Sequence, residues 1–198
     1  MFTGIIQSVG SIVDKQHKQG DFQFVIQTQF ADMTDVDLGD SIACNGVCLT
    51  VTEINDGQIS LDVSLETLSK TQVGDWQVGS AINLEKSLTL KDKLGGHMVS
   101  GHVDAVAHCM GIERSARSTI YQFKIPQNLD KYIVKKGSVA INGVSLTVNE
   151  IDDCVLSVNL IPHTLEHTNL GQLKQGDKVN IEIDTIARYV EKMLQKPT

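Results

Sequence analysis

Two nearly identical stretches, ACNGVCLTV and AINGVSLTV, carry the small polar side chains best suited to binding or chemistry. Asn-Gly favours a tight turn, and the run that follows it predicts a strand. Because strand side chains alternate between faces, Cys48 and Thr50 should share one face, and Ser145 and Thr147 the equivalent face. Thiol and hydroxyl groups among apolar neighbours suit a flat heteroaromatic ligand. These residues could instead only satisfy local backbone groups, but their repetition favours a pair of binding sites.

The histidines are candidates for proton transfer because imidazole titrates near neutral pH. His102, in the stretch GGHMVSGHVD, is the strongest of them, and a hydrogen-bonded structural role is its alternative. His97 would face the opposite way from His102 if the segment were a strand, so a shared metal is not expected. The stretch HTLEH, which holds His163 and His167, lacks the glutamate that follows the first histidine of a zinc motif. No metal site is therefore expected.

The strands and turns that hold these residues come in two copies. An offset of 97 positions, the spacing from Ser41 to Ser138, aligns the two halves without a gap. A period this long indicates duplicated domains rather than a solenoid. We predict domains at 1–97 and 98–186, followed by a helix and tail at 187–198. Identical residues at the offset include Met1 and Met98, Gly4 and Gly101, Asn45 and Asn142, Gly46 and Gly143, Thr67 and Thr164, Asn83 and Asn180, and Glu85 and Glu182.

Each copy has the alternating pattern of half-buried strands. Many short strands, frequent turn signals and little helix predict an all-β fold of two small closed antiparallel barrels. Closure would also remove exposed sheet edges. The alternating apolar positions are Phe22, Phe24 and Ile26, then Ile59, Leu61, Val63 and Leu65, with Tyr121, Phe123, Leu156, Val158 and Leu160 as counterparts.

The carboxyl-terminal stretch TIARYVEKML predicts a helix with Asp184 as its cap. Its apolar residues recur at the spacing of one helix face. A helix this short is marginal alone. We expect it to dock on its own barrel or on another subunit, and we favour a subunit interface. The apolar positions are Ile186, Tyr189, Val190, Met193 and Leu194.

Composition limits the class of protein. The formal charge of −7 argues against nucleic acid or an anionic membrane as a partner. No stretch is long and apolar enough to span a bilayer, and the start MFTGII does not look like a signal peptide. Without a secretion signal, the four cysteines are expected to be reduced thiols, mostly in the core of a cytoplasmic protein.

Several longer stretches of the sequence resemble those of a known protein family. MFTGII, GDSIACNGVCLTV, GGHMVSGHVD, KGSVAINGVSLTV and IPHTLEHTNL occur in the order found in the riboflavin synthase family, which the whole chain resembles. The resemblance implies two six-stranded Greek-key barrels and a carboxyl-terminal helix that assembles a homotrimer. It implies a dismutation of two 6,7-dimethyl-8-ribityllumazine molecules by transfer of a four-carbon unit. The products are riboflavin and 5-amino-6-ribitylamino-pyrimidinedione, and no cofactor is needed.

The resemblance also implies site residues, and an active site between the amino-terminal barrel of one subunit and the carboxyl-terminal barrel of its neighbour. The residues expected to act in catalysis are Ser41, Cys48, His102, Ser145 and Thr147. The amino-terminal pocket is expected to contain Phe2, Gly4, Ile5, Ile6, Ser41, Cys48, Leu49, Thr50, Asp62, Val63, Ser64, Leu65, Glu66 and Thr67. The carboxyl-terminal pocket is expected to contain Gly101, His102, Val103, Lys136, Ser145, Leu146, Thr147, Asn159, Leu160, Ile161, Pro162, His163 and Thr164.

Two identical substrates must take different roles, as donor and acceptor, so we expect the positions that differ between the copies to set those roles. These pairs are Phe2 and Val99, Ile5 and His102, Cys48 and Ser145, and Glu66 and His163. Neutral drift between the copies is the alternative.

A non-catalytic lumazine or flavin carrier on the same fold is the main rival function, and the retention of both polar pairs favours the enzyme. A flavin reductase would need a nicotinamide-binding domain, which the sequence lacks. Association with the enzyme that makes the lumazine is left open.

Overall fold

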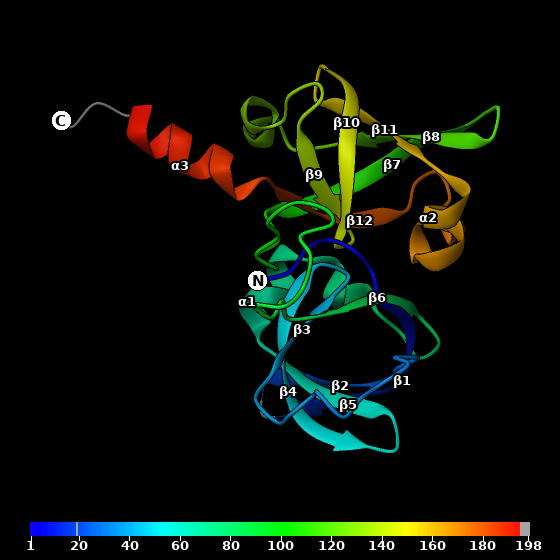
Figure 1. The fold of residues 1–198 in the computed structure, drawn as a ribbon, viewed down its shortest axis with the longest axis vertical. Coiled ribbons are helices and arrows are strands. Elements are labelled where there is room, and N and C mark those ends of the chain that lie inside the picture. Colours follow the sequence, from blue (N-terminus) through cyan, green and yellow to red (C-terminus); the bar gives the residue numbers. More distant parts are fainter. Residues whose placement is uncertain (19, 195–198) are drawn as a thin grey trace.

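The computed structural model describes residues 1–18 and 20–194 and contains two closed six-stranded antiparallel barrels. Figure 1 shows the amino-terminal barrel below the carboxyl-terminal barrel, with the last helix projecting away from both. The first barrel consists of β1 (Ser8–Lys18), β2 (Asp21–Gln27), β3 (Ser41–Cys44), β4 (Val47–Asn55), β5 (Gln58–Val63) and β6 (Ala81–Lys86), with α1 (Leu65–Lys70) and the 3-10 turn η1 (Gln72–Asp75) between β5 and β6.

The second barrel repeats this order. It consists of β7 (Ala105–Ser115), β8 (Ser118–Lys124), β9 (Ser138–Ile141), β10 (Val144–Asp152), β11 (Val155–Leu160) and β12 (Lys178–Ile183). The connections hold the 3-10 turns η2 (Gln127–Tyr132) and η3 (Asn169–Gln172) and the helix α2 (Pro162–His167), and α3 (Thr185–Leu194) follows the barrel.

Both barrels have one strand order. The first closes as β1-β2-β5-β4-β3-β6 and the second as β7-β8-β11-β10-β9-β12. The irregularities also recur: the register shifts after Ile12 and Val51 in the first barrel and after Cys109 and Val148 in the second. Since bulges bend strands locally, their repetition indicates that both copies turn their corners at equivalent places. The predicted pair of closed barrels is confirmed.

The cores follow the alternation seen in the sequence. Phe24 and Ile26 of β2, and Ile59, Leu61 and Val63 of β5, are buried. The prediction was wrong at Leu65, which begins α1 and is exposed. The strand ends because Ser64 caps a helix, its hydroxyl accepting a hydrogen bond from the backbone N–H of Thr67.

The two barrels meet through their Asn-Gly turns. Asn45, Gly46, Asn142 and Gly143 all have positive φ, as a tight hairpin turn requires. A Cβ atom on Gly46 would lie 2.7 Å from the backbone N of Gly143, and the reverse substitution would produce the same contact. The repeated sequence therefore has a structural use beyond its polar pairs, because each turn is where one barrel touches the other.

A buried amide network surrounds these turns. Asn83 Nδ2 donates to the carbonyl of Asn142 at 3.0 Å, and Asn180 Nδ2 donates to the carbonyl of Asn45 at 2.9 Å. Asn169 Nδ2 donates to Asn45 Oδ1 at 2.9 Å, and Gln72 Nε2 donates to Asn142 Oδ1 at 2.7 Å. Each bond has a partner at the 97-residue offset, so the barrels are related by an approximate twofold axis. Satisfied buried amides of this kind fix one arrangement of the halves.

Helix α3 begins as predicted, with Asp184 Oδ1 accepting from the backbone N–H of Ile186 at 3.0 Å. Polar contacts attach one side of it to the second barrel: Arg188 pairs with Asp104 at 2.6 Å, and Glu191 accepts from Lys131 and Tyr132. The apolar side is open to solvent, and Tyr189 and Met193 are 70% and 84% exposed. The last positions of the predicted tail, 195–198, lie outside the described residues. Among the described helices, none is long and apolar enough to cross a bilayer.

Candidate active site

Each polar pair lies on the outer surface of its barrel. In β4, Leu49 points into the core while Cys48 is half-buried and Thr50 is exposed. Ser41 of β3 is opposite Thr50 in the register and therefore lies on the same face. In the second barrel, Ser145 is half-buried and Thr147 is exposed. The shared faces predicted from the alternation are present in the structure.

The segments that cover these faces are exchanged between the barrels. The backbone N–H of Ser145 donates to the carbonyl of Gly4 at 2.8 Å, and that of Cys48 donates to the carbonyl of Gly101 at 2.9 Å. Ile6 likewise packs on the second core, and Val103 on the first. Within this chain, the amino-terminal segment therefore lies beside Ser145, and the 101–103 segment beside Cys48.

The grouping expected from the resemblance was wrong in this respect, because it placed each segment with its own repeat. The physical reason is a crossing of the two segments, at which Phe2 and Val99 form a β-bridge. Both side chains pack with Ala43 and Ala140 between the barrels, and Cys48 packs against this small cluster. The segments continue past the bridge onto the opposite barrels.

Two buried glutamates hold the exchanged segments in place. Glu85 accepts from the backbone N and the hydroxyl of Thr3, both at 2.6 Å, and from the backbone N of Gly4 at 2.9 Å. Glu182 makes the equivalent three bonds to Ser100 and Gly101 at 2.6–3.0 Å. Burial raises the pKa of Glu85, while the bonds from Thr3 and Gly4 oppose that shift. The sequence showed the pair as an identity at the offset but not as anchors of the site.

The remaining candidates divide by exposure. Several side chains are buried and are available to a ligand on the outer face only through their backbone: those of Phe2, Leu49, Val63 and Leu160. The structure places others on the surface, in connecting segments, at strand ends and on α1 and α2: Ile5, Asp62, Ser64, Leu65, Glu66, His102, Lys136, Asn159, Ile161, Pro162 and His163. Thr67, Leu146 and Thr164 are half-buried.

A cavity of about 580 Å³ extends the face of the second barrel towards α3. Its lining includes Ser138, which is opposite Thr147 in the β9–β10 register, and Val190 of α3. Its volume lies within the range of small-molecule sites. The polar face of the second barrel and the base of α3 therefore adjoin one hollow.

His97 is a residue that sequence reasoning missed, because it was weighed only as a metal ligand. It lies in a loop, not in a strand, and its Nδ1 is 2.7 Å from Ser145 Oγ. Burial lowers its pKa, with Asp184 opposing the shift. The paired glycines before it are a signal that could have found it, since glycine permits close approach of backbones.

Among residues 1–18 and 20–194, no group of three or more metal-ligating side chains is found. His163 and His167 stack on α2 with ring centroids 4.1 Å apart, and His167 Nδ1 bonds the carbonyl of His163. All four cysteines are free; Cys44, Cys109 and Cys154 are buried in the cores, as expected.

Comparison with known proteins identifies the family. The sequence matches the lumazine binding domain at residues 3–87 and again at 100–184. A riboflavin synthase of Photobacterium phosphoreum is 44% identical over 194 residues, covering 98% of this chain and 89% of that protein. One of Actinobacillus pleuropneumoniae is 45% identical over 196 residues, covering 99% and 91%. The chain belongs to the riboflavin synthase family.

Solved structures agree with this family assignment. LumP complexed with riboflavin superposes with a TM-score of 0.86 at 28% identity, covering 92% of this chain and 99% of that one. LumP complexed with 6,7-dimethyl-8-(1'-D-ribityl) lumazine gives a TM-score of 0.83 at 27% identity, covering 92% and 98%. The riboflavin synthase family and LumP therefore share this double barrel.

Proposed function

We propose that this protein converts two molecules of 6,7-dimethyl-8-ribityllumazine into riboflavin and 5-amino-6-ribitylamino-pyrimidinedione. The observation that carries the proposal is the presence, in both repeats, of a polar pair on the same outer strand face, each beside a buried glutamate anchor. A reaction between two identical molecules needs two such surfaces.

The chemistry asked of the protein is mild. The substrate's methyl group is acidic because its anion is delocalised into the ring, so the protein must orient two rings and move protons. Bringing two reactants together can contribute about 7–11 kcal/mol to lowering the barrier. The first barrel offers the thiol of Cys48 and the hydroxyls of Ser41 and Thr50. The second offers the hydroxyls of Ser145 and Thr147.

The site would be completed by assembly. Each polar surface is open on the outside of its barrel, so within one chain a ligand would remain exposed on one side. We place the first barrel of one subunit against the second barrel of its neighbour in a homotrimer, with α3 as the assembling element. The open apolar face of α3 supports this, because such a face is stabilised by burial.

The direct test is to mix the protein with the lumazine and follow riboflavin absorbance. Riboflavin production supports the enzyme, whereas stable binding with no riboflavin supports the carrier alternative. Sedimentation tests the trimer, and calorimetry tests for two lumazine sites per chain of unequal affinity; saturation at one site per chain contradicts the twin-site reading.

We also place the protein in the cytoplasm, where its four free thiols would stay reduced. Association with the enzyme that produces the lumazine would pass substrate directly to these open surfaces. Co-sedimentation of the two purified proteins tests it.

A further inference from the structure

Gln7 and Asp104 occupy equivalent positions at the ends of the two exchanged segments. Gln7 Oε1 accepts from the backbone N–H of Lys86 at 2.9 Å, and Asp104 Oδ2 accepts from the backbone N–H of Ile183 at 2.9 Å. Lys86 and Ile183 are themselves equivalent at the 97-residue offset. A neutral amide is therefore sufficient for this bond in the first repeat, and the negative charge of Asp104 needs another explanation.

Arg188 of α3 supplies that explanation. Its Nη2 lies 2.6 Å from Asp104 Oδ1, and the side chain of Asp104 is 8% exposed. Burial raises the pKa of Asp104, while the backbone N–H of Ile183 and the guanidinium of Arg188 oppose that shift. Because a buried carboxylate without a cation is costly, Asp104 and Arg188 act as one unit that joins α3 to the end of the segment.

The same guanidinium also reaches the part of the segment that covers the first barrel. Arg188 Nη2 donates to the carbonyl of His102 in a long hydrogen bond of 3.4 Å. This nitrogen carries two hydrogens, so it can serve both acceptors. On its other side the segment packs on the first barrel, where Val103 contacts the core and the carbonyl of Gly101 accepts from the backbone N–H of Cys48. The segment is therefore held between α3 and the first barrel.

We propose that Arg188 is a positioning residue, which holds His102 beside Cys48 on the outer face of the first barrel through its contacts with Asp104 and the carbonyl of His102. A segment fixed on both sides has little freedom to shift along that face. The helix α3 therefore contributes to a ligand face as well as to assembly. The identity of the ligand, and the use of His102 towards it, rest on the proposed function.

The first repeat offers an internal comparison. Its segment 4–7 cannot form this ion pair, because Gln7 carries no charge. The two segments are otherwise anchored alike: the backbone N–H groups of Ile5 and His102 each donate to the hydroxyl two residues earlier at 3.2 Å. Segment 4–7 therefore serves as the control for segment 101–104 in every variant.

The first test needs no activity and measures hydrogen exchange of the full chain. Arg188→Met and Asp104→Asn should each quicken exchange in 101–104 about fivefold or more and leave 4–7 unchanged, because loss of a restraint lets the segment open more often. Asp104→Asn keeps an acceptor for the backbone N–H of Ile183, as Gln7 does in the first repeat, so it removes only the ion pair. Unchanged exchange in 101–104 would overturn the proposal.

Sedimentation of the same variants separates positioning from assembly. Neither substitution alters the apolar face of α3, so both variants should sediment as the parent does. Lys131→Met is the matched control, because it breaks the ion pair of α3 through Glu191 and leaves Arg188 in place. It should leave exchange in 101–104 unchanged. Equal quickening in Lys131→Met, or quickening only in variants that have lost their assembly, would assign the effect to the docking of α3 and overturn the proposal.

The last test follows turnover of the lumazine. Arg188→Met and Asp104→Asn should each lower kcat roughly tenfold with KM within about twofold of the parent, as misplacement of a group that acts in the transition state predicts. The double variant should be no slower than the slower single variant, because both substitutions break one unit. Multiplicative losses, or a change confined to KM, would overturn the positioning role. If the parent makes no riboflavin, the proposed function fails, while hydrogen exchange still decides whether Arg188 holds the segment.

Discussion

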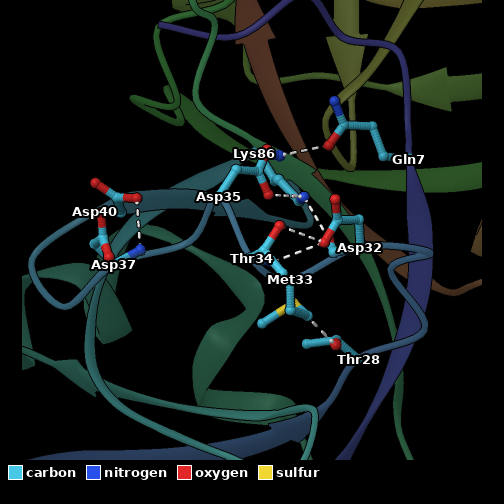
Figure 2. A network of polar contacts seen from close by, with 9 residues as sticks. All are labelled: Gln7, Thr28, Asp32, Met33, Thr34, Asp35, Asp37, Asp40 and Lys86. Carbon is cyan, nitrogen blue, oxygen red and sulfur yellow. Dashed lines mark hydrogen bonds and ion pairs between the residues drawn. The ribbon is translucent and has the colours of Figure 1, made fainter.

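The two barrels have the same fold, but different side chains hold their equivalent loops. In the first barrel, the loop between β2 and β3 is held by Lys86, whose Nζ donates to the carbonyl of Asp32 and pairs with Asp35 (Figure 2). The same ammonium lies 5.1 Å from the centre of the Phe30 ring. In the second barrel, the residue equivalent to Lys86 is Ile183, which is buried in the core.

The residues of these two loops differ in the same way as the residues that hold them. Asp32 is exposed in the first barrel, whereas its counterpart Leu129 is buried on η2 of the second. Equivalent backbone positions are thus held by polar contacts in the first barrel and by apolar burial in the second. The difference indicates that barrel closure does not depend on this loop, because both versions keep the same strand order and the same bulges. What the copies share more closely is the amide network where they meet, in which Gln72 of the first repeat takes the place of Asn169 of the second.

On the outer strand faces that carry the polar pairs, the difference between the barrels affects the proposed function. Cys48 lies beside the exchanged segment that carries His102, its backbone N–H donating to the carbonyl of Gly101, while the hydroxyl of Ser145 is hydrogen-bonded to His97. Two equal surfaces would hold two substrates alike, yet the reaction needs a donor and an acceptor. The comparison can therefore be tested by changing one barrel at a time.

The largest effect is expected from removing the feature that only the second barrel has. The counterpart of α3 in the first repeat is the linker, 87–97, so deleting residues 186–198 leaves both barrels complete. We expect smaller species on sedimentation that still bind the lumazine, with turnover reduced roughly 100-fold because the substrates are no longer brought together. An unchanged trimer would refute the assembling role of α3.

The next effect concerns the polar pair itself. If the copies have assigned roles, Cys48→Ser should lower kcat roughly tenfold, as loss of a positioned acid–base or packing group does, and Ser145→Cys should have a much smaller effect. Lumazine binding should remain in both variants. Equal losses, or a double variant as active as the parent, would mean that the difference is neutral drift.

A smaller effect is expected at the loop anchor. Lys86→Met removes the bonds to Asp32 and Asp35 and should lower the free energy of unfolding by about 1–2 kcal/mol. Hydrogen exchange should quicken in 28–40 but not in 125–137. Lys178→Met, which breaks only the exposed pair with Asp75, is the control and should cost less than about 1 kcal/mol. Equal losses would remove the contrast between the anchors.

The smallest effect is a pH dependence of stability. Because burial lowers the folded-state pKa of His97, the unfolded chain takes up a proton first as pH falls below about 6.5. Stability contributed by the neutral ring is present above that pH and is lost down to the folded pKa. The melting temperature of the parent should therefore decline more between pH 7 and 5 than that of His97→Asn. Parallel plots of melting temperature against pH for the two proteins would contradict a lowered pKa of His97.

Much of the fold could be predicted from the sequence, because burial imposes a period on each strand and duplication imposes a period on the chain. Phe24, Ile26 and their counterparts face the cores for this reason. The short helices α1 and α2 were not predicted, because six residues are too few to show a helical period. Leu65 continues the alternation of β5, and only the cap at Ser64 ends the strand there.

The site was harder to predict for a different reason. The types of its residues follow from the repeated stretches, but which barrel each segment covers depends on the crossing at Phe2 and Val99. Both repeats contain the same glycine at Gly4 and Gly101, so either pairing fits the sequence equally well. His97 was missed because its role depends on Ser145, which is distant in the chain and near only after folding.

The contact between Gly46 and Gly143 has a consequence for how such a chain can change. Each residue there meets its own counterpart, and four of the amide bonds around it form two pairs related by the offset. A single repeat could make the same contacts with a second copy of itself, as a homodimer does. Covalent linkage is therefore not what creates the interface. Linkage instead allows the two halves to differ in sequence. A mutation in a homodimer alters both sites at once, whereas here a cysteine and a serine can occupy equivalent positions in one chain.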